Sequence, residues 1–160
     1  MEKENRIRAF QELTILRNKN ITLLKQVPEE KALIIPDKFS NNLYWQAGHI
    51  LTTQMSLIYR RSNLEMPLID TKYLDYFGKG TSPANFVKGI PSYSTLLKQL
   101  SEAILILEKD LHTYADKKYA EPAHVSFGMT LQSFHDAVIA IPYHEAYHMQ
   151  AINLLLKQIK

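Results

Sequence analysis

The chain has 160 residues, of which 46% are hydrophobic and 22% are charged, as expected for one globular domain that buries its own core. It contains no cysteine, which excludes disulfides, a thiolate nucleophile in the chain and any metal site with cysteine ligands. Its net charge is +3, but the basic residues are dispersed among acidic ones, whereas nucleic-acid binding needs a concentrated basic surface. We therefore expect a single domain, residues 1–160, that binds no nucleic acid.

The start of the chain carries mixed charge, and no apolar segment of the kind found in signal peptides follows it. No later stretch approaches the roughly 18 uncharged apolar residues of a membrane-spanning helix. We therefore expect a cytoplasmic protein that does not insert into membranes, and the lack of cysteine is compatible with that location.

Apolar periodicity predicts four helices, and polar caps or prolines mark their ends. In chain order they are residues 3–27, stopped by Pro28; 42–61, capped within Ser40-Asn41-Asn42; 92–114, capped by Ser92 or Ser94; and 130–160, capped by Thr130. The third helix has the clearest apolar stripe, which we expect to lie in the core. No segment shows the alternation typical of a strand, so the predicted fold class is all-α, a four-helix bundle.

Two features depart from this regular pattern. Residues 62–91, between the second and third helices, contain many glycines and prolines and predict a long connection with little regular structure. Long loops in compact domains are usually functional or mobile, and we expect this one to determine the substrate. Pro142 lies inside the last helix, where it removes the hydrogen bond to Val138 and is expected to kink or interrupt the helix.

Two histidines, His144 and His148, lie one helical turn apart in the last helix. Four residues advance a helix by about 400°, so both rings lie on one face, about 6 Å apart along it, and can bind one ion. With Glu145 they match H-E-x-x-H, the motif of zinc metalloproteases. That motif requires another ligand after the second histidine, but residues 149–160 contain no His, Asp, Glu or Cys. This absence argues against the protease interpretation, and any third protein ligand must come from upstream.

Four other histidines are available for that third position. His135 lies nine residues before the pair, half a turn out of phase, and is expected to face away. His112, near the end of the third helix, and His124, in a predicted loop, have ordinary explanations but are not excluded. His49 lies in the middle of the second helix, and facing helices of a bundle place metal ligands in its core.

Two segments of the chain together resemble a known family. NLYWQAGHI at 42–50 and HEAYHMQAI at 144–152 resemble the DinB/YfiT-like family of four-helix-bundle metalloproteins. Residues 76–83 also resemble a connection found in many members, and the resemblance covers nearly the whole chain. One departure is that the family often has Gly-Gln after the second histidine of the pair, whereas here Met149 precedes Gln150.

The resemblance implies that His49, His144 and His148 bind a divalent metal, because the family uses one histidine of the second helix and an H-x-x-x-H pair of the last. Three neutral imidazoles leave the ion its full +2 charge and at least one open position, as in catalytic zinc sites. Zinc is the expected metal and nickel is an alternative, because such sites accept several divalent metals. The resemblance also implies a homodimer.

Family members of known activity include transferases that use bacillithiol and an isomerase that uses mycothiol, and the resemblance implies a similar role here. Because the chain has no cysteine, a nucleophilic thiol would have to arrive as a cosubstrate. The prediction is a metal-dependent enzyme that activates an external low-molecular-weight thiol for transfer to an electrophilic small molecule. Two alternatives stay open: a hydrolase of a small amide or ester that uses water activated by the metal, and a noncatalytic stress-associated binding or interaction module.

Glu145 is the candidate catalytic residue, as a group that transfers protons. The alternative is that it pairs with a neighbouring helix, or accepts a hydrogen bond from the far nitrogen of a ligand histidine. Trp45 is either a core side chain or a platform for the substrate, and Tyr143 and Tyr147 either pack in the core or line a cleft. Tyr73, Tyr76 and Phe77 either cover the site or anchor a loop.

Overall fold

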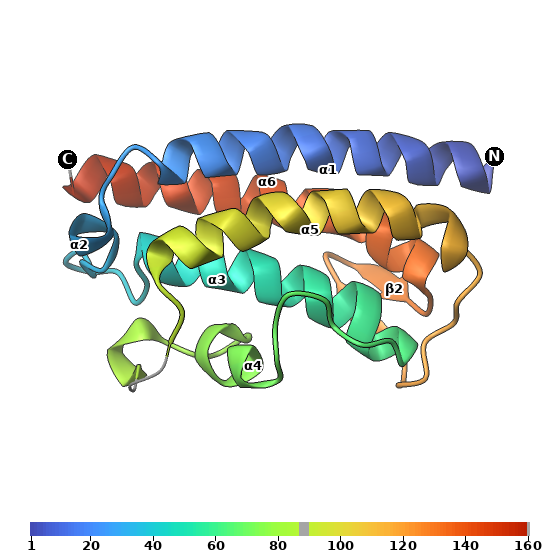
Figure 1. The fold of residues 1–160 in the computed structure, drawn as a ribbon. Coiled ribbons are helices and arrows are strands. Elements are labelled where there is room, and N and C mark those ends of the chain that lie inside the picture. The colour runs from blue at the N-terminus through green and yellow to red at the C-terminus, as the bar shows by residue number, and fades with distance from the viewer. Residues whose placement is uncertain (87–89, 160) are drawn as a thin grey trace.

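The computed structural model describes residues 1–86 and 90–159, and it shows four long helices packed lengthwise (Figure 1). These helices are α1 (Glu2–Leu24), α3 (Leu43–Gln54), α5 (Tyr93–Thr113) and α6 (Phe134–Ile159). The shorter elements are α2 (Glu29–Ala32), a π-helical turn (Met55–Tyr59), a 3₁₀ turn (Arg60–Ser62), α4 (Lys72–Phe77), a second 3₁₀ turn (Pro83–Asn85), β1 (His124–Ser126) and β2 (Met129–Leu131). The predicted all-α fold is confirmed.

Parts of two predicted segments fall outside the described residues. The expected connection 62–91 includes residues 87–89, and the expected last helix includes residue 160. Within the described ranges, none of the helices combines the length and the apolar character needed to cross a bilayer.

The direction of the helices explains the long connection. Helices α1 and α6 run one way, whereas α3 and α5 run the other way (Figure 1). Two hydrogen bonds confirm that α3 and α5 are parallel, because the later residue of one segment contacts the later residue of the other. Gln54 Nε2 donates to the Ala103 carbonyl at 3.3 Å, and the Tyr59 hydroxyl, in the turn after α3, donates to Asp110 at 2.8 Å. Because α3 and α5 are parallel, the chain must return along the length of the bundle between them, as in bundles with long crossover connections.

Local sequence explains where two of the long helices begin. Asn42 Oδ1 accepts a hydrogen bond from the Trp45 N–H at 2.8 Å, and Ser92 Oγ accepts one from the Thr95 N–H at 3.1 Å. Each cap satisfies an N–H group that the helix itself leaves without a partner. The predicted caps of these two helices are therefore confirmed. The predicted apolar stripe of α5 is buried, and it includes Leu96, Leu100, Ala103, Ile104, Leu107 and Leu111.

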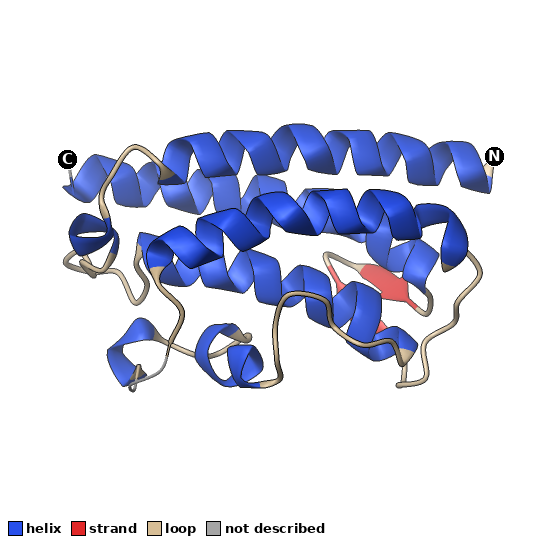
Figure 2. Ribbon diagram, in the orientation of Figure 1, coloured by secondary structure: helices blue, strands red, loops and turns tan. Residues whose placement is uncertain are grey.

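The prediction that no strand is present was wrong for residues 124–131, which form a two-stranded antiparallel hairpin (Figure 2). Its strands have three residues each, too short for alternation to be recognised. Phe127 and Gly128 connect them with φ of 49° and 76°, as a type I′ turn requires, but phenylalanine is not a residue that signals such a turn. The hairpin occupies Thr130, so α6 begins later than predicted, and Ser133 Oγ accepts from the Asp136 N–H at 3.1 Å.

Two further predictions differ from the structure in part. The predicted helix 42–61 is helical over nearly that range, but only Leu43–Gln54 is α-helical, and a π-helical turn and a 3₁₀ turn follow it. These rare geometries have no distinct apolar period. Pro142 does not interrupt the last helix, because α6 extends from Phe134 to Ile159 with the proline inside it. A proline removes only one helical hydrogen bond, and this one is buried among the packed helices.

Helix α1 buries a stripe that is partly polar. Arg17 and Asn20 are fully buried beside the apolar Leu13, whereas the apolar Ile7 and Phe10 are only half-buried. The reason is the partner that faces this stripe, since α6 contributes a buried carboxylate, Glu145.

The segment around α4 docks onto α3 through Gly48. Phe77, the last residue of α4, is fully buried, and its ring lies where a β-carbon at position 48 would stand. Only glycine therefore allows this approach of the Phe77 ring to the helix. The close approach also brings the Phe77 carbonyl to His49, where it accepts a hydrogen bond from Nδ1 at 2.6 Å.

We expect Gly48→Ala to lower the free energy of unfolding by about 1–3 kcal/mol, because the new methyl group overlaps the Phe77 ring in a packed core. Metal affinity should fall as well, because Phe77 orients His49. Urea denaturation and metal titration measure the two effects. The Gly48→Ala/Phe77→Leu double variant should recover part of the stability lost in Gly48→Ala; a double variant no more stable than Gly48→Ala would contradict this account.

Candidate metal centre

Helices α3 and α6 bring His49, His144 and His148 together. Among the described residues these form a group whose potential ligand atoms all lie within 4.8 Å of one another. The three side chains are buried, each with less than a tenth of its surface exposed. The ring centres of the two α6 histidines are 4.3 Å apart, and those of His144 and His148 lie 5.1 and 4.8 Å from the ring centre of His49.

The distance between two of the nitrogens fits a shared metal ion. Nε2 of His49 and Nε2 of His144 are 3.3 Å apart. Two imidazole nitrogens, each about 2.0–2.1 Å from one tetrahedral zinc ion, would lie about 3.4 Å apart. The residues present therefore suit a divalent ion with histidine ligands, which agrees with a chain that contains no cysteine.

Hydrogen bonds to the far nitrogens orient two of the three rings. His49 Nδ1 donates to the Phe77 carbonyl, and His148 Nδ1 donates to Gln46 Oε1 at 2.5 Å. A proton held on Nδ1 leaves Nε2 free to bind a metal, and such partners orient metal-binding histidines in general. His144 Nδ1 is buried and has no hydrogen-bond partner among the described residues, so its ring is positioned by packing.

Sequence reasoning assigned no role to Gln46 or to the Phe77 carbonyl. Gln46 lies three residues before His49 on the same helix, so its position was a usable signal for a polar group beside the site. The carbonyl gave no such signal, because every residue has one.

An aromatic side chain and a threonine support His49 from the other side. The Trp45 ring stacks on His49 with centres 4.4 Å apart and planes 11° apart. Its Nε1 donates to Thr81 Oγ1 at 2.9 Å, and that hydroxyl lies 2.8 Å from the Tyr76 carbonyl and 2.9 Å from the Gly78 carbonyl. The connection between α3 and α5 thus holds both Trp45 and His49.

Burial keeps the three imidazoles neutral. Desolvation lowers the pKa of all three, and to about 3 for His148, where the charge of His49 lowers it further. For His144, repulsion from His148, His49 and Arg17 adds to the effect of burial on the pKa. Neutral imidazole is the form that binds metal ions, so the site favours the ligand form at neutral pH.

Comparison with family models matches residues 12–152 to the DinB superfamily. The chain belongs to the DinB superfamily. The match covers 141 of 160 residues, counting both ends of the matched range, and includes all three histidines. No curated protein matches this sequence. The family resemblance seen in the sequence is therefore confirmed.

In this DinB-superfamily chain the three histidines line a cleft of about 690 Å³. Its wall also contains Trp45 and Tyr147, together with residues of the loop before α3, of the connection after α4 and of the β-hairpin. Phe127, at the tip of the hairpin, packs near both Tyr147 and His144, at ring distances of 6.1 and 6.4 Å. Trp45 and Tyr147 thus belong to the wall of the cleft.

The other candidate aromatic residues lie elsewhere. Tyr73 and Tyr76 pack against Phe77, with ring centres 5.8 and 6.2 Å apart, and none of the three lines the cleft. They anchor the connection to α3. Tyr143 is exposed and lines a separate shallow surface depression near the start of α1.

The remaining histidines do not join the three-histidine group. His135 Nδ1 lies 3.4 Å from the Arg6 guanidinium, on the α1 side of α6, so it faces away from the pair as predicted. His112 is exposed in the last turn of α5. His124 lies on β1 and lines the cleft at a distance from the histidine cluster.

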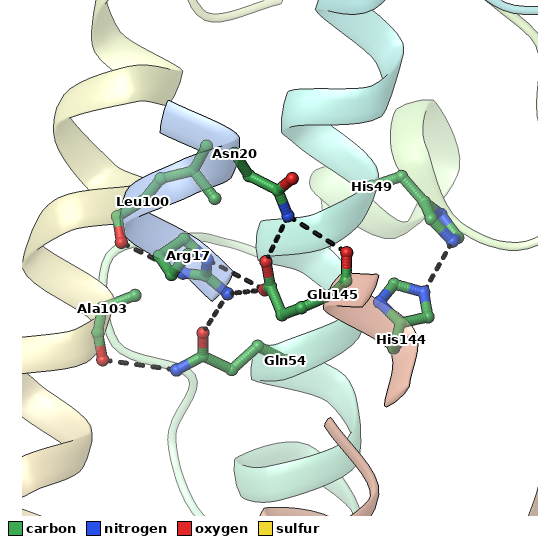
Figure 3. Close-up of polar contacts among 8 residues, drawn as sticks. All are labelled: Arg17, Asn20, His49, Gln54, Leu100, Ala103, His144 and Glu145. Carbon is green, nitrogen blue, oxygen red and sulfur yellow. Dashed lines mark hydrogen bonds and ion pairs between the residues drawn. The ribbon is translucent and has the colours of Figure 1, made fainter. Parts of the chain in front are cut away.

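The structure places Glu145 on the α1 side of α6, away from the cleft. Its carboxylate is fully buried and forms an ion pair with Arg17, and its other oxygen accepts from Asn20 Nδ2 at 2.8 Å. Arg17 also donates to Gln54 at 2.8 Å and to the Leu100 carbonyl at 3.0 Å. Figure 3 shows Glu145 directed at Arg17 and Asn20, while His144 points to His49. This network connects α6 to three other helices. Among the described residues, the hydrogen-bond partners of the Glu145 carboxylate are Arg17 and Asn20, not a histidine.

Replacement of Glu145 should therefore affect stability first. We expect Glu145→Ala to lower the free energy of unfolding by about 3–5 kcal/mol, because it leaves the buried Arg17 charge without its partner. Urea denaturation measures this loss, and the Arg17→Met/Glu145→Leu variant should be more stable than Glu145→Ala. A Glu145→Ala protein with unchanged stability and lost activity would instead support proton transfer by Glu145.

The metal-free protein should lose stability as the pH falls from about 7 to 5. The histidine pKa values are lower in the folded state than the value of about 6.5 expected in the unfolded chain. The unfolded state therefore binds more protons in this range, so its free energy falls relative to that of the folded state. Thermal unfolding at several pH values measures the effect. The stability of His148→Asn should depend less on pH than that of the His112→Asn control. Identical stability profiles of the two variants would show that His148 does not contribute to the loss of stability at low pH.

Proposed function

We propose that this protein is a metal-dependent enzyme that activates an external low-molecular-weight thiol for transfer to an electrophilic small molecule. His49, His144 and His148 hold the divalent ion, with zinc expected and nickel as the alternative. The observation that carries the proposal is the position of three buried, neutral imidazoles in the wall of an open cleft. Membership of the DinB superfamily supports it.

The residues of the chain have defined tasks in this proposal. A divalent ion bound by three neutral ligands keeps its +2 charge and supplies a Lewis acid that lowers the pKa of a thiol or of water. Phe77 and Gln46 hold two ligand rings in position, and Trp45 covers one face of His49.

At the electrophilic carbon, thiol transfer makes one bond and breaks one. The electron pair of the thiol sulfur forms a bond to the electrophilic carbon, the bond from that carbon to its leaving group breaks, and the thiol proton is transferred to the leaving group. Since the chain has no cysteine, the sulfur must come from the cosubstrate. We propose that Glu145 does not accept this proton, because its carboxylate is buried on the far side of α6.

The cleft also separates this proposal from its alternatives. Zinc hydrolases of the H-E-x-x-H type use a glutamate as the general base that takes a proton from water, and among the described residues that line the cleft there is no Asp or Glu. This favours the thiol, whose proton is far easier to remove than that of water. A noncatalytic module would need no cleft above the histidines, whereas the structure has one of about 690 Å³.

The expected homodimer and cytoplasmic location belong to the same proposal. Family membership supports the dimer, which light scattering tests. The reducing cytoplasm keeps small thiols available in their reduced form.

Metal analysis is the first test. Protein purified without chelators should contain close to one divalent ion per chain, and His49→Ala and His144→Ala should lose it because each removes one of three ligands. His112→Ala, whose side chain is exposed and outside the site, is the matched control. Wild-type protein without metal would favour the noncatalytic module.

Turnover then distinguishes the two enzymatic alternatives. Transfer of a small thiol to an electrophile should require the metal and should be lost in His144→Ala. Transfer that continues in metal-free protein would contradict the proposal, and metal-dependent hydrolysis without any thiol would favour the hydrolase.

A further inference from the structure

The cleft is lined by three basic side chains outside the histidine cluster. Arg61, Lys79 and His124 all line it, and each comes from a different segment: the 3₁₀ turn after α3, the connection after α4, and β1. Among the described lining residues there is no acidic side chain to offset their charge. The fold therefore brings these three basic side chains to one cleft from distant parts of the sequence.

His124 shares the cleft with two cations whose charges act on it. Burial lowers the pKa of His124 most, and the charges of Arg61 and Lys79 lower it further. The lining of the cleft and this effect both indicate a positive environment around His124.

Arg61 is held in a fixed orientation. Its guanidinium lies 3.4 Å from Glu121, donates to the Pro122 carbonyl at 3.2 Å, and lies 5.9 Å from the centre of the Tyr119 ring. Glu121 also pairs with Arg60 at 3.3 Å, so two cations share one carboxylate and a net positive charge remains. A preorganised guanidinium loses less entropy on binding an oxyanion than a free one.

The same cleft joins these basic side chains to the histidines. Lys79 follows by two residues the Phe77 carbonyl that binds His49. Arg61 lies twelve residues after His49, at most about 18 Å along a helix axis, and the hydroxyl side chains of Thr53 and Ser56 line the cleft between them. A single small molecule could therefore place a reactive group at the histidines and an anionic group at the basic side chains of the same cleft.

We propose that Arg61, Lys79 and His124 form an oxyanion-binding wall that recognises a carboxylate or phosphate group on the small molecule that reacts at the histidines. The reaction at the histidines rests on the proposed function above, whereas the oxyanion-binding wall is inferred from the residues that line the cleft. The substrate class is an anionic thiol or an anionic electrophile. Charge-assisted hydrogen bonds to such a group are the strongest that these side chains form.

The wall can be tested without any thiol chemistry. Trp45, the single tryptophan of the chain, lines the cleft, so its fluorescence reports binding of succinate or of inorganic phosphate. Lys79→Ala and Arg61→Ala should weaken binding of at least one of these anions about tenfold, because each removes one charge-assisted hydrogen bond. Comparison of succinate with phosphate shows which oxyanion the wall prefers.

Two variants serve as controls. Arg60→Ala removes the other arginine that pairs with Glu121, and Lys72→Ala removes an exposed lysine of α4; neither residue lines the cleft. Both variants should bind the anions as the wild type does. Binding should persist in metal-free protein, which excludes direct coordination of the anion to the ion. Equal affinities in all five proteins, or no binding of either anion, would overturn the proposal.

A second measurement separates this inference from the proposed function. Cobalt-substituted protein reports sulfur binding by its absorption spectrum, with mercaptosuccinate as an anionic thiol and thioglycerol as a neutral one. Tighter binding of mercaptosuccinate that is lost in Lys79→Ala supports both proposals. Equal binding of the two thiols, unaffected by Lys79→Ala, retains the thiol chemistry and overturns the oxyanion wall. If neither thiol changes the spectrum while succinate binding still depends on Lys79, the wall stands and the thiol chemistry fails.

Discussion

The buried ion pair between Glu145 and Arg17 determines how the last helix sits in the bundle. A carboxylate and a guanidinium without exposed surface are costly to remove from water, and their attraction offsets that cost only when their geometry is good and their other hydrogen-bonding groups have partners. Here Asn20, Gln54 and the Leu100 carbonyl provide those partners. Because Glu145 must face α1, the neighbouring His144 is rotated about 100° away and faces α3, so an interaction outside the cleft orients a histidine inside it.

A second constraint acts from the opposite side of the site. Gly48 lets the Phe77 ring reach α3, and the Phe77 carbonyl then binds His49. The same connection reaches Trp45 through Thr81 and carries Lys79 into the cleft. One segment therefore orients His49, holds the Trp45 ring that stacks on it and contributes Lys79 to the wall of the cleft. Its length follows from the parallel arrangement of α3 and α5, and its composition from these contacts.

The cleft combines two chemically different groups of side chains. Three imidazoles are kept neutral by burial, and repulsion from neighbouring imidazoles adds to this for His144 and His148, which suits the three to bind a cation. Arg61 and Lys79 line the same cleft and suit an anion. Burial thus separates the two groups, because a buried side chain is more costly to charge than one near water.

The sequence by itself determined the helical class, the caps at Asn42 and Ser92, the stripe of α5 and the pairing of His144 with His148, because these depend on residues within one or two turns of each other. Family resemblance added His49. Only the tertiary structure decided what Glu145 faces, since a helix can turn any side to its neighbours until packing selects one. It also decided the roles of Gln46, of the Phe77 carbonyl and of Arg61 with Lys79, which come from segments distant in the chain. The hairpin and the π-helical turn escaped detection because three-residue strands and single irregular turns are too short to leave a period in the sequence.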